Sequence, residues 1–228
     1  MRPFYQGETI DLVVPTLEHA ESSSWADWFN SQQTNRFTNH AIFPNTVADQ
    51  RDFLLSLRDS GRLALLVTNK VDGEPIGTVS LSGIDFRTRI ATIAIVMDTE
   101  SSVKSSTFSS LEAMAALTQH AFDVLGLERV QAGQVYPGLA KWTQILEVLG
   151  FRAEGFRRGA FMRGHDVADG ITLAVLYPRF QRLVHQRGGT LWPGSAQIIS
   201  LIRALPEKSF AEILDESQRT LEAEYFGD

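Results

Sequence analysis

The chain has 228 residues, of which 43% are hydrophobic and 21% charged, as expected for a globular protein that buries its own core. Its formal net charge of −6 argues against nucleic acid as a partner, because phosphate binding needs a basic surface. The absence of cysteine excludes disulfides and thiolate catalysis. No window approaches the roughly 20 apolar residues of a membrane span. We therefore expect a cytoplasmic protein that binds neither nucleic acid nor membrane.

The first part of the chain predicts alternating strands and short helices. Thr16 is placed to cap a helix that reaches about Phe29. A capping-box pattern at Thr46 starts a second helix, which ends near Asp59. The predicted strands lie at 10–14, 63–68, 76–81 and 90–97. Short turns join the last three strands, which is typical of an antiparallel meander.

The second part predicts two helices packed on a sheet, and then a helical tail. Gly126 and Gly150 are placed to end the two helices. The predicted elements are a helix at 107–125, a strand at 129–136, a helix ending at 149, strands at 151–157 and 171–177 around a polar turn at 163–170, and tail helices at 195–205 and 206–225. We divide the chain into a domain at 1–185 and a linker with helical extension at 186–228. This extension could pack on the core or mediate a homodimer.

A polar loop joins the strand at 90–97 to the helix that begins at Thr107. The first backbone N–H groups of a helix have no partner within it, and the helix dipole favours negative charge there. The arrangement predicts an anion site, with a solvated Ser-rich loop as the alternative.

Two further segments carry candidate chemistry. The loop at 30–44 contains Asn35 and His40, which are candidates for substrate contact or residues of an ordinary surface loop. His165 and Asp166 lie in the predicted polar turn, where a carboxylate beside an imidazole could form a base. An exposed turn without function is the alternative. We find no His and carboxylate spacing that indicates a metal site.

The element order and three segments resemble the GNAT acetyltransferase superfamily over about residues 7–183. The segments lie at 25–30, at 120–130 and at 146–155, the last with its helix end followed by Gly-Phe-Arg and Glu-Gly. Within the superfamily the chain looks most like ribosomal-protein N-terminal and amino-sugar N-acetyltransferases. The resemblance implies an α/β fold with a mixed, mostly antiparallel central sheet flanked by helices, here with a helical C-terminal extension.

The resemblance also implies acetyl-CoA held between two splayed parallel strands. Its pantetheine arm would run along Ile95, Val96 and Met97, and its pyrophosphate would lie on the helix N-terminus. The residues implied at the pyrophosphate are Lys104, Ser105, Ser106, Thr107, Phe108, Ser109 and Ser110. The amine attacks the thioester directly and needs no nucleophilic residue. Tyr136 could act as the general acid or be an ordinary core tyrosine, and Asp98 could hold a substrate ammonium or cap the loop.

The chain departs from the family pattern at the pyrophosphate loop, which usually reads Arg/Gln-x-x-Gly-x-Gly/Ala. Ser105 stands at the first position, Phe108 at the first glycine and Ser110 at the last. Thr92 stands where an acidic residue is common. We therefore carry two hypotheses. One is an acyl-CoA-dependent N-acyltransferase acting on a small primary amine such as an amino sugar or amino acid. The other is a catalytically degenerate domain that serves as a binding or assembly module.

Overall fold

The computed structural model describes residues 3–37, 43–57, 59–98, 107–163 and 165–227. Within these ranges eight strands form one sheet in the order β1-β2-β3-β4-β5-β6-β8-β7. The strands are β1 Tyr5–Gln6, β2 Ile10–Val13, β3 Leu63–Asn69, β4 Pro75–Asp85, β5 Ile90–Met97, β6 Arg129–Tyr136, β7 Arg152–Arg163 and β8 Asp166–Leu176. Neighbouring strands are antiparallel except β5 and β6, which are parallel. This confirms the predicted mixed, mostly antiparallel sheet.

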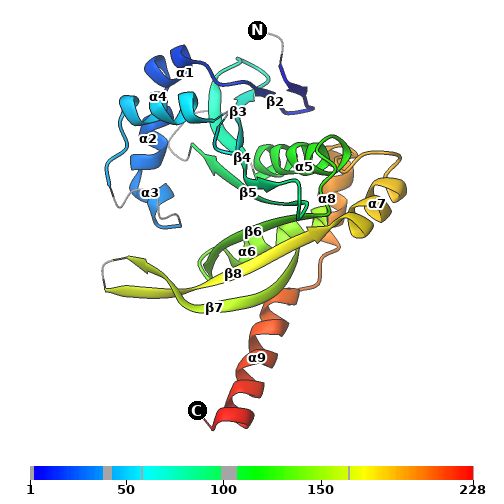
Figure 1. The fold of residues 1–228 in the computed structure, drawn as a ribbon. Helices are drawn as coiled ribbons and strands as arrows, with labels where there is room; N and C mark the ends of the chain where they lie inside the picture. The colour runs from blue at the N-terminus through cyan, green and yellow to red at the C-terminus, as the bar shows by residue number, and fades with distance from the viewer. Residues whose placement is uncertain (1–2, 38–42, 58, 99–106, 164, 228) are drawn as a thin grey trace.

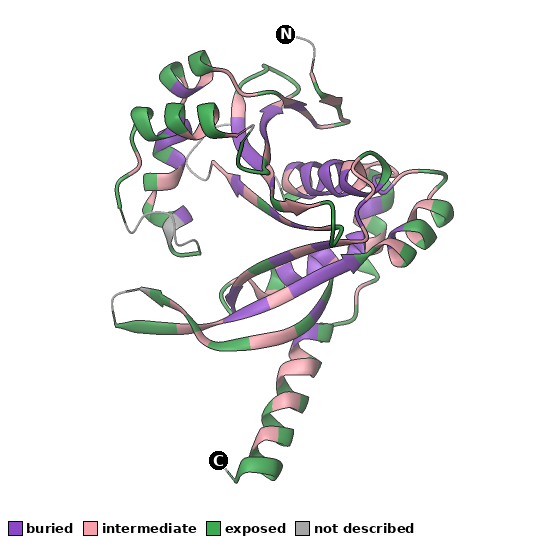
Figure 2. Ribbon diagram, viewed as in Figure 1, coloured by how far each residue is buried: buried purple, intermediate pink, exposed green. Residues whose placement is uncertain are grey.

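Helices cover both faces of this sheet (Figure 1). They are α1 Leu17–Ser22, α2 Trp25–Asn30, α3 Gln32–Asn35, α4 Val47–Ser56, α5 Thr107–Asp123, α6 Ala140–Leu146 followed by the 3₁₀ turn η2 Glu147–Leu149, α7 Tyr177–Gln186, α8 Ser195–Arg203 and α9 Phe210–Phe226. The largest core cluster includes the apolar stripe of α5, and Figure 2 shows this helix as almost wholly buried. A smaller core on another side joins Trp25 and Trp28 of α2 to Leu66 of β3 and Val96 of β5.

The sheet opens between its two parallel strands. β5 and β6 pair only from Ile90 with Arg129 to Thr92 with Gln131. At the last pair, Gln131 Nε2 donates a hydrogen bond to Thr92 Oγ1 over 3.0 Å. Beyond it the two halves of the sheet diverge (Figure 1). β5 keeps its other neighbour, β4, as far as Met97, so only one edge of β5 faces the opening.

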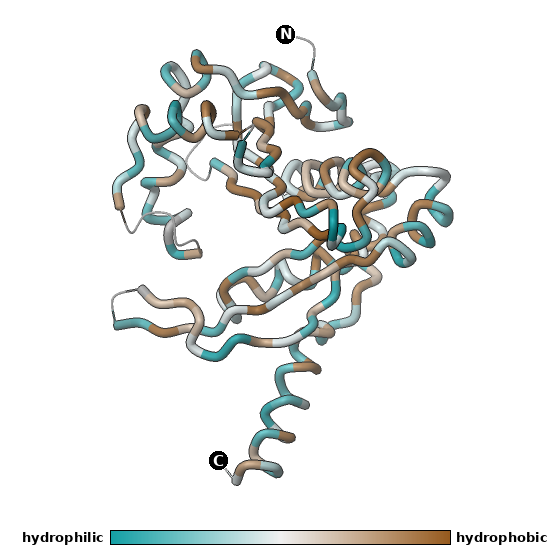
Figure 3. The backbone as a smooth tube through the Cα atoms, viewed as in Figure 1, coloured by the Kyte–Doolittle hydropathy of each residue, from teal (hydrophilic) through white to brown (hydrophobic). Residues whose placement is uncertain are grey.

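The segment after β8 completes the main core. Leu191, Trp192, Ile198 and Ala211 are buried in the same cluster as α5. The carboxylate of Glu8 accepts a hydrogen bond from Trp192 Nε1 over 3.0 Å, which fixes the segment before α8 against the N-terminal strands. The last turns of α9 then project away from the sheet (Figure 1), with hydrophilic and hydrophobic residues alternating along them (Figure 3).

Three local predictions differ from the structure. The single helix expected from Thr16 is two helices, because Ser23 Oγ binds the carbonyl of His19 and also accepts from the N–H of Trp25. The polar turn expected at 163–170 is mostly strand, since β7 and β8 form a long hairpin. Helix α7 was not predicted at all, and it follows β8 directly.

Candidate functional site

A cavity of about 630 Å³ lies at the opening between β5 and β6. β5 lines it with Ile93 to Met97, β6 with Ala132 to Val135, α5 with Thr107, Ser110 and Met114, and α6 with Trp142 and Leu146. α3 and the β7–β8 hairpin supply further walls, which include Thr34 and Arg157. The cavity therefore lies where the sheet splits, and it reaches from the start of α5 to the hairpin.

The β5 wall is where the resemblance expects the pantetheine arm of an acyl-CoA. Ile95, Val96 and Met97 line the cavity, and their role in binding the arm stays a prediction. Their backbone has no pairing with β6, because that ladder stops at Thr92. A ligand with amide groups can therefore pair with this edge as an added strand would.

The start of α5 forms the wall predicted to hold the pyrophosphate. Thr107 and Ser110 line the cavity, whereas Ser109 is buried. Phe108 does not line it; its half-buried side chain packs against the main core cluster. The ring is therefore directed into the core rather than across the path of a phosphate. Lys104, Ser105 and Ser106 lie outside the described residues.

Tyr136 lies at the end of β6 and is not among the described residues that line the cavity. Val135 pairs with Gly170 and Tyr136 with Asp169, and successive strand side chains point to opposite faces. Its ring packs on Phe156 with ring centroids 4.9 Å apart. Burial, and after it the nearby carboxylate of Asp215 on α9, raises the pKa of Tyr136. Its role as a general acid stays a prediction.

The other predicted site residues are spread around the cavity. Asp98 follows β5, and its N–H donates to the carbonyl of Ile76 over 2.9 Å. His165 and Asp166 are exposed at the tip of the β7–β8 hairpin. Asn35 ends α3, the helix that supplies Thr34 to the cavity, and His40 lies outside the described residues. None of Asp98, His165 and Asp166 is among the described residues that line the cavity.

Three residues that line the cavity were not predicted as site residues from the sequence. Arg157 is the charged side chain at the hairpin wall, and Thr34 is a buried residue of α3 whose Oγ1 has no hydrogen-bond partner among the described residues. Gln134 of β6 bonds to Thr143 Oγ1 on α6, which fixes the amide at the cavity wall. The alternation of apolar and polar residues along 152–157 places Arg157 on one face of a strand, but the sequence does not show which face of that strand the cavity adjoins.

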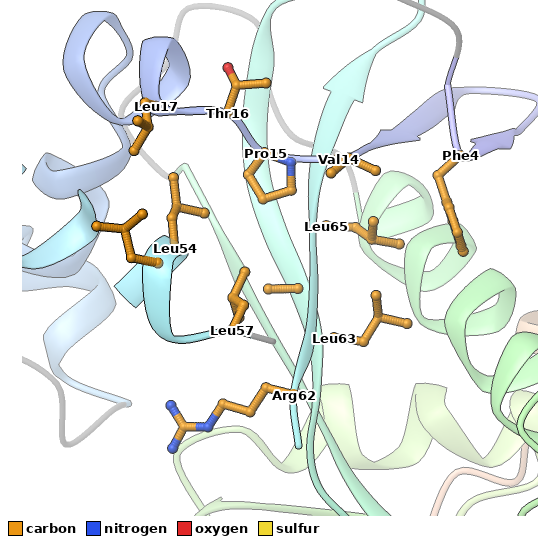
Figure 4. A pocket seen from close by; sticks show the side chains of 12 residues that line it. Phe4, Val14, Pro15, Thr16, Leu17, Leu54, Leu57, Arg62, Leu63 and Leu65 are labelled. Carbon is orange, nitrogen blue, oxygen red and sulfur yellow. The ribbon is translucent and has the colours of Figure 1, made fainter. Parts of the chain in front are cut away.

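A second cavity of about 450 Å³ is almost wholly aliphatic. Leu54 and Leu57 lie on one side of it and Leu63 and Leu65 on the other (Figure 4). Among the described side chains that line it, only Thr16 and Arg62 carry polar groups. It therefore offers packing surface rather than the groups that acyl transfer needs.

Across the described ranges, no helix is long and apolar enough to cross a membrane. In the same ranges, no group of His, Asp and Glu side chains gathers in a way that could hold a metal ion.

Comparisons with known proteins identify the family. The model of the acetyltransferase (GNAT) domain matches residues 10–152, more than half of the chain. No curated protein matches the sequence. Among solved structures, spermidine N-acetyltransferase from Vibrio cholerae in complex with CoA and spermine is 15% identical, with a TM-score of 0.67 over 77% of this chain and 99% of its own. Mycobacterium smegmatis RimJ in complex with CoA-disulfide is 18% identical, with a TM-score of 0.61 over 78% and 88%.

A GNAT-family acetyltransferase from Bacillus anthracis is 16% identical, with a TM-score of 0.62 over 75% of this chain and 97% of its own. At these identities the three structures establish a shared fold. The family model supplies the sequence evidence, and it spans both parallel strands and the helix between them. The chain therefore belongs to the GNAT acetyltransferase family.

Proposed function

We propose that this protein is an N-acyltransferase that uses acetyl-CoA as its acyl donor and a small primary amine as its acceptor. The observation that carries the proposal is the cavity at the split between β5 and β6, bounded by the unpaired edge of β5 and the start of α5. Two of the structural neighbours are complexes with CoA or its disulfide, which supports a CoA thioester as donor. An amino acid or amino sugar is the kind of acceptor that we expect.

The reaction needs positioning more than a reactive side chain. The acceptor nitrogen, in its neutral form, attacks the thioester carbonyl carbon. The C–N bond forms, the C–S bond breaks, and the proton released by the nitrogen passes to the CoA thiolate. The backbone of β5 would orient the thioester, and the walls from α3 and the hairpin would orient the amine.

Calorimetric titration with acetyl-CoA and with CoA tests this proposal. We expect a dissociation constant below roughly 100 μM, which corresponds to about −5.5 kcal/mol. Gly133→Leu should weaken binding at least about tenfold, because Gly133 lines the cavity and its added side chain would fill it. Gly155→Leu is the matched control, since a Cβ at Gly155 on β7 meets nothing within 4 Å.

If neither CoA compound binds, the acyltransferase proposal fails and the binding or assembly module becomes the better hypothesis. Binding without acetylation of any amine would instead favour a domain that has kept CoA and lost catalysis. The residues predicted for catalysis, Tyr136, His165 and Asp98, are then tested by Tyr136→Phe, His165→Ala and Asp98→Asn. Each variant should lower the turnover number if its side chain takes part.

The surface of α9 supports the homodimer expected from the C-terminal extension. Leu221 and Tyr225 lie one turn apart on one side of this helix and are 63% and 84% exposed. A second copy of the chain could cover this side, because antiparallel helix pairs bury such apolar side chains. Sedimentation of the wild type and of Leu221→Glu tests it: the variant should be monomeric. The cytoplasmic location stays a prediction.

A further inference from the structure

We infer that the acceptor amine carries a negatively charged group, a carboxylate or phosphate, and that Arg157 binds it. This inference rests on the proposed function, because it concerns the acceptor end of the same cavity. Arg157 is the one charged residue among the described residues that line the cavity. A cationic acceptor would place its charge near this guanidinium, whereas an anionic acceptor would be attracted to it.

The sheet register directs Arg157 toward the cavity. Arg157 of β7 and Val135 of β6 both pair with Gly170 of β8, so the three residues form one row across the sheet. Side chains in such a row share a face. Val135 lines the cavity, and Arg157 lines it from the other end of the row.

Gly170 leaves room for the guanidinium to lie across the sheet. A Cβ at Gly170 would be 3.5 Å from Arg157 Nη2 and 3.7 Å from Nε. The guanidinium therefore lies over the backbone of Gly170, in the direction of Val135. A bulky residue at 170 would displace this group without removing its charge.

Arg157 differs from its neighbour Arg158 in having no charged partner within the described part of the protein. Arg158, on the other face, pairs with Asp169 and Asp215. Arg157 forms no ion pair or side-chain hydrogen bond with another described residue. A planar guanidinium binds carboxylates and phosphates with two parallel hydrogen bonds. In this position Arg157 is thus a binding group and not part of the protein's own ion-pair network.

Thr34 is a second observation that points to a ligand. It lines the same cavity from α3, the residue is 8% exposed, and its Oγ1 has no hydrogen-bond partner among the described residues. A buried hydroxyl without a partner costs stability unless a ligand or water binds it. A polar acceptor bound between Thr34 and Arg157 would satisfy both groups.

The test uses probes that share an amine and differ in the group at the other end. γ-Aminobutyrate, its amide and putrescine have four carbons each and end in a carboxylate, an amide and an ammonium. Phosphoethanolamine and its neutral counterpart ethanolamine form a second pair. Comparing this pair with γ-aminobutyrate and its amide shows whether the site prefers a phosphate or a carboxylate. Calorimetry on protein saturated with CoA measures binding of each probe without turnover, and kcat/KM is then measured with acetyl-CoA.

We expect an anionic probe to bind about tenfold to hundredfold more tightly than its neutral counterpart, the range of a charge-assisted hydrogen bond. Putrescine should bind most weakly. Arg157→Gln should abolish the preference, Arg157→Lys should restore part of it, and Gly170→Val should reduce it. Arg152→Gln, at an exposed residue of the same strand that does not line the cavity, is the control and should leave the preference unchanged.

CoA binding is measured first, so the two proposals fail in different ways. If CoA does not bind, the proposed function fails and this inference falls with it. If CoA binds and no anionic probe is preferred, only the inference is overturned. A preference that survives in Arg157→Gln overturns it as well.

Discussion

Arg158 on β7 donates from Nη1 to the carboxylate of Asp215 on α9 over 2.8 Å. The same nitrogen lies 2.8 Å from a carboxylate oxygen of Asp169 on β8, and Arg219 lies 3.5 Å from that carboxylate. These partly buried charges fasten α9 to the sheet, directly behind the row that holds Arg157.

Asp215→Asn should loosen α9. The side chains of Arg158 and Asp215 are 31% and 15% exposed, so the pair lies between a surface and a buried ion pair. We expect a loss of about 1–2 kcal/mol in the free energy of unfolding, measured by urea denaturation. Lys208→Gln is the control: it breaks a more exposed pair with Glu216 and should change stability by less than about 0.5 kcal/mol. Equal losses of stability in Asp215→Asn and Lys208→Gln would show that the Arg158–Asp215 pair does not hold α9 on the sheet.

Glu112→Gln should destabilise the turn that precedes β2. The carboxylate of Glu112 is fully buried and accepts from the N–H groups of Glu8 and Thr9 and from Thr9 Oγ1. An amide is neutral and accepts through only one atom, so every donor loses a charged partner and at least one is left without an acceptor. We expect a loss of about 2–3 kcal/mol, read from the same denaturation curves. Glu128→Gln, in an exposed ion pair, should have little effect.

The contact between Glu8 and the segment before α8 should weaken in acid. A hydrogen bond from the backbone of Ser195 lowers the pKa of Glu8 below its usual value, and Trp192 adds a second bond. Because the folded-state pKa is depressed, this contribution is present above the unfolded pKa of about 4.3 and is lost as the pH falls through the folded pKa.

The thermal midpoint of Glu8→Gln should therefore approach that of the wild type as the pH falls below about 4. A constant difference at every pH would show that the charge of Glu8 is not what matters. Glu18→Gln, at an exposed position on α1, serves as the comparison.

Phe108→Ala should lower stability and leave CoA binding almost unchanged. The ring packs against the core and does not line the cavity. For a half-buried ring we expect a loss of about 1–3 kcal/mol, below the 3–5 kcal/mol of a fully buried phenylalanine. A large gain in CoA affinity in calorimetry would instead show that the ring obstructs the phosphate path.

Local signals predicted much of the fold. The capping box at Thr46 is present, with Thr46 Oγ1 accepting from the N–H of Asp49 over 3.2 Å. Gly150 ends the helical run in a left-handed conformation, with φ +90°. Such features depend on a few neighbouring residues, and the sequence contains them directly.

The position of Arg157 in the cavity depends on the strand register of the β7–β8 hairpin, which the sequence alone does not reveal. The register of β7 against β8 shifts between Arg157 and Phe161. A shift of one residue exchanges the two faces of a strand, so alternation alone cannot decide whether Arg157 or Arg158 faces the cavity. Phe108 is a different case: helical spacing puts it on the apolar stripe of α5, and its ring does pack against the core.

The bond between Trp192 and Glu8 joins residues 184 positions apart. Together with the buried side chains of Leu191, Ile198 and Ala211, it makes the end of the chain part of the same core as the beginning. Contacts so distant in sequence form late, because the intervening chain must first be ordered. A chain that ends before Leu191 would lack these contacts and expose the core surface that they cover, so such truncated chains should depend on chaperones.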